Sequence, residues 1–142
     1  MTLDHAAIRG LVPHAGAMCL LHEVLQADTD SIRVRAVSHR DPANPLRECG
    51  VLPALCGVEY AAQAMAVHGA LQGGPRGGRP RPGVLAAVRD VELAVERLDD
   101  IAEDLLIEVH CLLNESGRLL YRFEVRANGR ELLQGRATVV TE

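Results

Sequence analysis

The chain has 142 residues, of which 48% are hydrophobic and 24% charged, as expected for one folded domain over residues 1–142 with a sizeable core. Aromatic residues make up only 2% and tryptophan is absent, which argues against binding surfaces built on stacked aromatic rings. The formal net charge of −4 argues against sequence-independent binding to nucleic acid.

The first part of the chain predicts one short helix and two strands. Apolar residues near helical spacing predict a helix over Leu3–Leu11. An apolar run predicts a strand over Met18–Ala27, and the turn residues Asp28–Asp30 end it. Strict alternation of apolar residues with arginine predicts a half-buried strand over Ser31–Val37.

A loop and a long helix follow. The segment His39–Leu52 carries two prolines and a glycine and is typical of an ordered loop. Pro53 suits the first turn of a helix, which we expect to run to about Leu71. The glycine-, proline- and arginine-rich segment Gly73–Gly83 predicts a flexible loop inside one domain.

The last part of the chain predicts four strands joined by tight turns. Asn114–Gly117 and Asn128–Gly129 are hairpin signals, and the second is the stronger of the two. Consecutive strands should therefore be largely antiparallel. The predicted strands are Val84–Val95, Leu105–Leu113, Leu119–Ala127 and Glu131–Val140.

The helix at the centre of the chain is apolar on nearly every side. Such a helix is unstable on a surface, so a sheet of about six strands must wrap around it. The pattern therefore predicts an α+β fold with a long central helix and an antiparallel sheet.

Glu59 is an unusual residue in this helix. It lies within the small, apolar run Pro53–Ala66, where a carboxylate needs a partner or a chemical role. A tie to Gln63, one turn later on the same face, is the structural alternative. His39 precedes the helix and could be an ordinary loop histidine. Together, an acid and a base in an apolar slot can eliminate water from a hydroxyacyl compound.

The cysteines and the apolar runs give only negative indications. The cysteines have no Cys-x-x-Cys spacing, so neither a metal site nor a redox cofactor is expected. No apolar run approaches the roughly 20 residues that span a bilayer, and no signal pattern opens the chain, so we expect a cytoplasmic protein that is not membrane-bound. The four cysteines are Cys19, Cys49, Cys56 and Cys111.

The run Pro53–Gln63 resembles the proline-glycine-valine-leucine-x-x-glutamate-x-x-x-glutamine signature of the β-hydroxyacyl-acyl carrier protein dehydratases. Upstream, Leu11–His14 and Met18–Val24 are similar to the opening blocks of that family. Ser38-His39 stands where the family has its catalytic histidine. The resemblance covers most of the chain and implies the hotdog fold, which the pattern of helix and strands also fits.

A narrower resemblance rests on Asp41–Leu46 and Arg89–Val91, which look like the dehydratase branch of aryl-polyene and related fatty-acid-like pathways. It implies dehydration of 3-hydroxyacyl thioesters, carried on acyl carrier protein, to trans-2-enoyl thioesters. His39 would take the α proton and Glu59 would protonate the departing hydroxyl, with no metal or other cofactor.

The resemblance also implies how the substrate is held. Backbone N–H groups of Leu55, Cys56 and Gly57 would face the thioester carbonyl, and Gln63 would orient Glu59 or bind water. In the resembling family the two catalytic residues of one site come from opposite subunits. A homodimer, or a heterodimer with a related hotdog subunit, is therefore expected.

The arginines of the glycine-rich loop have two interpretations. They could meet an acidic carrier protein or the phosphate of its pantetheine arm, or they could simply be solvated. They are Arg76, Arg79 and Arg81.

Two departures from the family pattern leave alternatives open. The loop after His39 is longer than usual, and Ala54 replaces the signature glycine. One alternative is a hotdog thioesterase, in which Glu59 activates water and His39 is incidental. The other is a catalytically weak partner subunit that completes a heterodimeric dehydratase.

Overall fold

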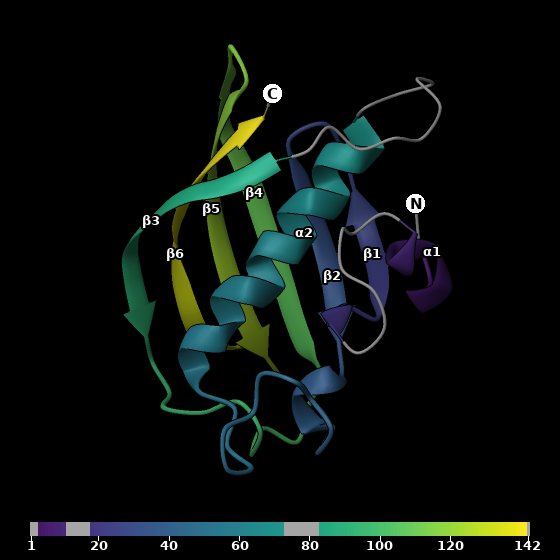
Figure 1. The fold of residues 1–142 in the computed structure, drawn as a ribbon, viewed down its shortest axis with the longest axis vertical. Coiled ribbons are helices and arrows are strands. Elements are labelled where there is room, and N and C mark those ends of the chain that lie inside the picture. Colours follow the sequence, from purple (N-terminus) through teal and green to yellow (C-terminus); the bar gives the residue numbers. More distant parts are fainter. Residues whose placement is uncertain (1–2, 11–17, 73–82, 142) are drawn as a thin grey trace.

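A computed structural model describes residues 3–10, 18–72 and 83–141. These residues form a six-stranded sheet with one long helix, α2, lying across one face (Figure 1). This arrangement confirms the predicted α+β class. The helices and strands are α1 (His5–Arg9), β1 (Glu23–Ala27), β2 (Ser31–Ala36), α2 (Gly57–Gln72), β3 (Gly83–Leu93), β4 (Leu105–Glu115), β5 (Arg118–Ala127) and β6 (Arg130–Thr141), with short 3-10 helices η2 (Ser38–Arg40) and η3 (Ala54–Cys56).

The strands follow the order β1-β2-β4-β5-β6-β3, and all neighbours are antiparallel. Both hairpin predictions are confirmed. Asn128 and Gly129 have φ of 50° and 77°, the left-handed pair that a tight two-residue hairpin turn requires. Ser116 and Gly117 take φ of 50° and 79° between β4 and β5.

The core lies between α2 and the sheet. On β5 the alternating residues Tyr121, Phe123 and Val125 are buried, as the sequence pattern indicates. On β4 the alternation holds only to Val109. The register shifts between Cys111 and Leu113, and Leu113 is 40% exposed, because a bulge turns the end of the strand.

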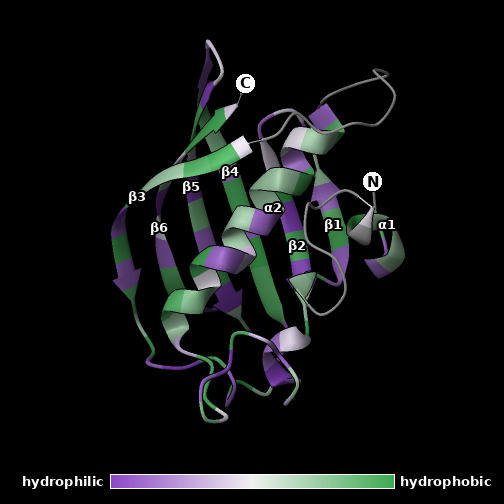
Figure 2. Ribbon diagram, in the orientation of Figure 1, coloured by the Kyte–Doolittle hydropathy of each residue, from purple (hydrophilic) through white to green (hydrophobic). Residues whose placement is uncertain are grey.

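Hydrophobic residues are spread around α2 and not confined to one face (Figure 2). The sheet of the same chain nevertheless covers only one side of the helix. On the other side Val58, Ala62 and Ala66 remain half-buried. The expected wrapping is therefore only partial within a single chain.

Several boundaries differ from the sequence predictions. The strand expected from Met18 begins at Glu23, although Cys19, Leu20 and Leu21 are buried. The first helix ends at Arg9, and its cap is Asp4, whose Oδ1 accepts from Ala7 N–H at 2.9 Å. The predicted loop before β3 lies outside the described residues, apart from Gly83.

The long helix starts differently from the prediction as well. Pro53 does not begin an α-helical turn; it precedes the 3-10 turn of η3, and α2 starts at Gly57. Gly57 lies against Leu133 of β6, and a Cβ on it would come within 2.6 Å of Leu133 Cδ2. This glycine therefore sets how closely the helix approaches the sheet.

Gly57→Ala is expected to destabilise the protein by about 1–3 kcal/mol, because the fully buried Leu133 must shift to admit a methyl group. Urea unfolding measures the change. Gly69→Ala is the matched control, since a Cβ there would meet nothing within 4 Å and Gly69 is exposed in the same helix. There alanine should stabilise by about 0.5–1 kcal/mol. Equal effects at the two positions would contradict the packing argument.

Candidate active site

Glu59 lies in the first turn of α2 and is half-buried. Gln63, one turn later, has its Nε2 3.5 Å from Glu59 Oε1. The amide of Gln63 is otherwise engaged with backbone, because Oε1 accepts from Leu20 N–H at 2.9 Å and Nε2 donates to Met18 O at 2.6 Å. Gln63 thus fixes the segment before β1 to the helix beside Glu59. A substrate contact would require it to give up one of these bonds.

The expected carbonyl-binding amides lie at the start of the helix. Two of the three are already engaged, since Cys56 N–H donates to Pro53 O at 3.0 Å and Gly57 N–H donates to Ala54 O. Leu55 is 58% exposed. Burial, with the nearby charges of Glu48 and Glu59, raises the pKa of the Cys56 thiol. The thiol is therefore protonated at neutral pH and is not an activated nucleophile.

His39 lies in η2 and is wholly buried. Its Nε2 is 3.1 Å from Ile101 O and 2.9 Å from Glu103 O. Both partners are carbonyl oxygens, so Nε2 carries the proton and Nδ1 carries the lone pair. Nδ1 is buried without a hydrogen-bond partner among the described residues. Burial lowers the pKa of His39, so the ring is neutral at neutral pH with Nδ1 as its basic atom.

Ionic contacts hold the segment 101–104 over His39. Arg40 donates to Ala102 O and to Asp104 Oδ1. Arg35 donates to Asp104 Oδ2 at 2.8 Å. Hydrogen bonds from Arg35 and then Arg40 lower the pKa of Asp104, so its carboxylate stays charged at neutral pH.

Among the described residues, no hydrogen bond joins His39 to Glu59 in one chain. Their sequence neighbours are joined instead. Ser38 Oγ donates to Leu20 O at 2.7 Å, so the Tyr60 hydroxyl, 2.8 Å away, donates to Ser38. Asn44 Nδ2 donates to the same tyrosine oxygen at 3.1 Å. Sequence reasoning missed this network, although a hydroxyl-bearing ring inside an apolar helix was a usable signal.

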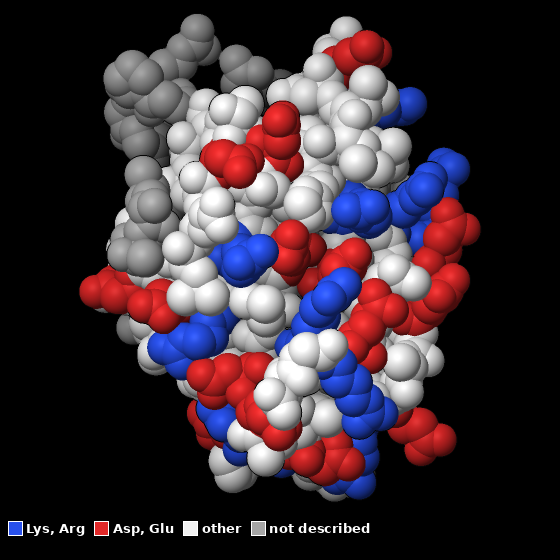
Figure 3. Space-filling model, turned by 180° about the vertical axis from the view of Figure 1, so that it is seen from behind, with Lys and Arg blue, Asp and Glu red and all other residues white. Residues whose placement is uncertain are grey.

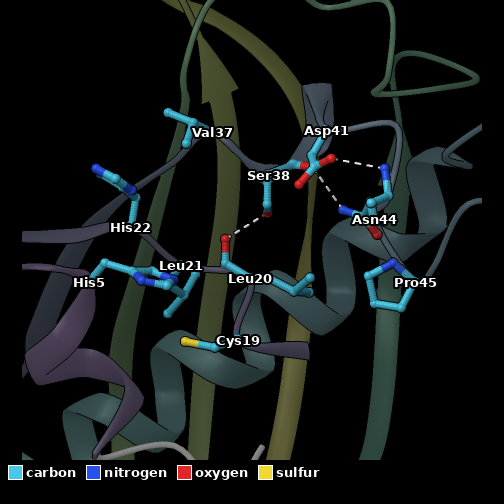
Figure 4. A pocket seen from close by; sticks show the side chains of 11 residues that line it. His5, Cys19, Leu20, Leu21, His22, Val37, Ser38, Asp41, Asn44 and Pro45 are labelled. Carbon is cyan, nitrogen blue, oxygen red and sulfur yellow. Dashed lines mark hydrogen bonds between the residues drawn. The ribbon is translucent and has the colours of Figure 1, made fainter. Parts of the chain in front are cut away.

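A cavity of about 260 Å³ lies on one side of this network (Figure 4). Ser38 and Asp41 line one wall, and the rings of His5 and His22, stacked with centroids 5.8 Å apart, line another. Neither His39 nor Glu59 lines it. The cavity is therefore separate from the two residues expected to carry the chemistry.

The described ranges also bear on metal binding and on membrane insertion. Within residues 3–10, 18–72 and 83–141, no three His, Cys, Asp or Glu side chains are grouped so as to hold a metal ion. In the same ranges, no helix has both the length and the apolar character needed to cross a bilayer. The arginines of the glycine-rich loop lie outside the described residues.

Comparison with protein families gives a match over nearly the whole chain. The family model described as ApeP-like, ApeP dehydratase, matches residues 6–142. The chain belongs to this dehydratase family. No curated protein sequence matches it significantly.

Solved structures place the ApeP-like chain in the hotdog fold. The dehydratase heterocomplex ApeI:P from Xenorhabdus doucetiae is similar at 23% identity, with a TM-score of 0.84 over 95% of this chain and 90% of that chain. A hypothetical thioesterase with coenzyme A from Streptococcus pneumoniae TIGR4 is similar at 13% identity, with a TM-score of 0.60 over 84% of each chain. The predicted hotdog fold and the predicted family are both confirmed.

The buried His39 predicts a pH dependence of folding in this ApeP-like protein. Its pKa is lowered on folding, so the unfolded chain binds the proton more readily. The stability that the neutral ring contributes is complete above its ordinary pKa of about 6.5 and is lost as pH falls toward the folded value. Urea unfolding between pH 8 and 5 should show this loss in the wild type and a shallower slope in His39→Gln. Parallel slopes would contradict it.

Proposed function

We propose that the protein dehydrates 3-hydroxyacyl thioesters to trans-2-enoyl thioesters, with the acyl group delivered on the pantetheine arm of an acyl carrier protein. A fatty-acid-like or aryl-polyene pathway in the cytoplasm is the proposed setting. The observation that carries the proposal is Glu59, a half-buried carboxyl at the start of an apolar helix in a chain of a dehydratase family. The neutral His39, with its free lone pair, supplies the complementary base.

The proposed reaction needs two proton transfers. Nδ1 of His39 takes the α proton, and the electron pair left on the α carbon forms the new double bond as the β C–O bond breaks. Glu59 gives a proton to the departing hydroxyl, which leaves as water. Because Nδ1 is enclosed in the single chain, this role requires the residues that enclose it to move when substrate or a second subunit binds.

A second hotdog subunit is part of the proposal, either another copy or a related chain. The β1 edge of the sheet is already occupied at Val24, which exchanges backbone hydrogen bonds of 3.1 and 2.7 Å with Leu3. Among the described residues, no strand pairs with the outer edge of β3 (Figure 1). Leu85 and Val88 lie on the helix side of this strand and are 38% and 36% exposed. The similar ApeI:P structure is a heterocomplex, which supports a partner subunit.

Mass spectrometry of a 3-hydroxyacyl carrier protein incubated with the pure protein tests the proposal. Loss of one water mass from the acyl group is the expected result, and release of the free acid would overturn it. If the acyl group is unchanged by the protein alone, the assay is repeated with an added hotdog subunit. Loss of water only in the presence of the added subunit assigns the chain to a heterodimeric enzyme. No loss of water in either assay refutes dehydration.

A hotdog thioesterase is the second candidate, and one observation favours it. Glu59 is partly exposed, whereas His39 is enclosed, so a carboxylate acting on water needs no rearrangement around His39. His39→Ala distinguishes the two reactions. Hydrolysis should survive this substitution, and dehydration should not. Circular dichroism of the variant confirms that it is folded, and His39→Gln repeats the test if alanine unfolds it.

A further inference from the structure

Three arginines form a row across the outer face of the sheet, the face turned away from α2. The strand register places Arg89 of β3 opposite Arg136 of β6, and Arg136 opposite Arg122 of β5. His110 of β4 continues the row beyond Arg122. Arg122 lies between the buried Tyr121 and Phe123, so its side chain points outward (Figure 3 shows this face). We call Arg89, Arg136 and Arg122 the arginine row.

The arginine row has no partner within the described part of the chain. All three side chains are exposed, and among the described residues none of them makes a hydrogen bond or ion pair. Like charges directly opposite on neighbouring strands repel and destabilise a sheet. The repulsion along the row is therefore not offset by any direct pairing of these side chains among the described residues.

The row of residues beside it is acidic but is engaged elsewhere. The register places Glu124 opposite both Glu108 and Gln134, and Gln134 opposite Glu92. Each of the three carboxylates has a partner outside the arginine row. The pairs are Glu92–Gln134 at 2.9 Å, Glu108–His110 at 2.9 Å and Glu124–Arg126 at 2.8 Å.

On its other side the arginine row borders a neutral, largely apolar row. The strand register sets these residues opposite one another, two positions from the arginines on β3, β6 and β5, and beyond the bulge on β4. They are Ala87, Thr138, Leu120 and Leu113. Leu113 is 40% exposed. The surface therefore presents one row of positively charged side chains beside one row of largely apolar side chains.

We propose that the arginine row is the docking site for an acidic amphipathic helix of a partner protein. Neighbouring strands lie about 4.8 Å apart, and one helical turn rises about 5.4 Å, so carboxylates at i, i+4 and i+8 can each face one arginine. The planar guanidinium suits bidentate pairing with carboxylates. The apolar row would receive the apolar flank of the same helix.

The width of the row favours a helix over other polyanions. A membrane surface or a nucleic-acid duplex is broader than one row of side chains, and it would also meet the acidic row. Docking at this row does not depend on the proposed enzymatic reaction.

The test is an NMR titration of the full ¹⁵N-labelled chain with a synthetic helical peptide of about five turns, carrying glutamate at i, i+4 and i+8 and leucine on the adjoining face. Amide shifts should be confined to the parts of β3, β6, β5 and β4 that carry the arginine row and the apolar row. Binding should weaken about tenfold in R122E/R136E, because two ion pairs are replaced by repulsion. R118E/R130E changes the same charge on the same two strands and should leave the affinity unchanged.

Several results overturn the proposal. They are equal binding of a peptide with glutamine in place of glutamate, equal loss in R118E/R130E, and no loss in R122E/R136E. Binding of phosphatidylserine vesicles or of a DNA duplex that R122E/R136E abolishes overturns the choice of a helix. If charge reversal unfolds the chain, R122Q/R136Q is titrated instead, and undiminished binding there has the same meaning.

Discussion

Glu59→Gln is expected to slow dehydration of a 3-hydroxyacyl carrier-protein thioester about 10²- to 10⁴-fold, because glutamine cannot give a proton to the departing hydroxyl. The amide has nearly the shape of the carboxyl and can keep the contact with Gln63, so the fold should survive. Product formation is followed by mass spectrometry at saturating substrate. The subunit composition is kept the same as in the wild-type assay.

Glu48→Gln is the matched control for this change. Glu48 is exposed, and its charge acts on Cys56, as the charge of Glu59 does. The Glu48→Gln substitution therefore changes the local electric field without removing the proposed acid. Its rate should stay close to that of the wild type. A Glu59→Gln variant that keeps wild-type turnover would remove Glu59 from the mechanism.

Leu85→Asp combined with Val88→Asp is expected to abolish association with a second hotdog subunit and, with it, dehydration. The leucine and valine side chains lie on the helix side of the open edge of β3, where a partner would bury them. Burying two unpaired carboxylates at an interface is strongly unfavourable. Sedimentation of the protein, alone and mixed with the partner subunit, measures the loss of the complex.

Leu112→Asp is the control for the edge variant. Leu112 is 49% exposed and lies on β4, a strand in the middle of the sheet order. The substitution therefore places the same charge on an exposed leucine away from the proposed interface. This variant should associate and react normally. A double variant at Leu85 and Val88 that still associates would refute the edge as the contact surface.

The fold could be predicted largely from periodicity and turn residues. The alternation of apolar and polar residues on β5 predicted that strand, and the Asn128-Gly129 turn predicted its antiparallel pairing with β6. Both signals depend only on local sequence. The strand predicted to begin at Met18 was wrong over Met18–Leu21, because Cys19, Leu20 and Leu21 are buried through tertiary contacts and not through strand pairing. Gln63, far along the chain, holds this segment by Leu20 N–H and Met18 O. No local pattern indicates such a bond.

The candidate site could be predicted only in part. Glu59 stands out because it is a charge in an apolar helix, and the structure places it at the start of that helix. The surroundings of His39 were not predictable. The carbonyl oxygens that accept the hydrogen bond of its Nε2–H belong to Ile101 and Glu103, in a loop far along the chain. Its catalytic role, like the substrate-binding roles of Leu55, Cys56, Gly57 and Gln63, stays a prediction.

The unequal ends of the sheet limit how far subunits can assemble. Leu3 occupies the backbone N–H and C=O of Val24 on β1, where another strand would have to pair, whereas β3 leaves its own groups available among the described residues. If two sheets join through β3, each contributes its one accessible end, and both outer ends of the product are blocked. Such an assembly would stop after one addition and would not polymerise into fibres.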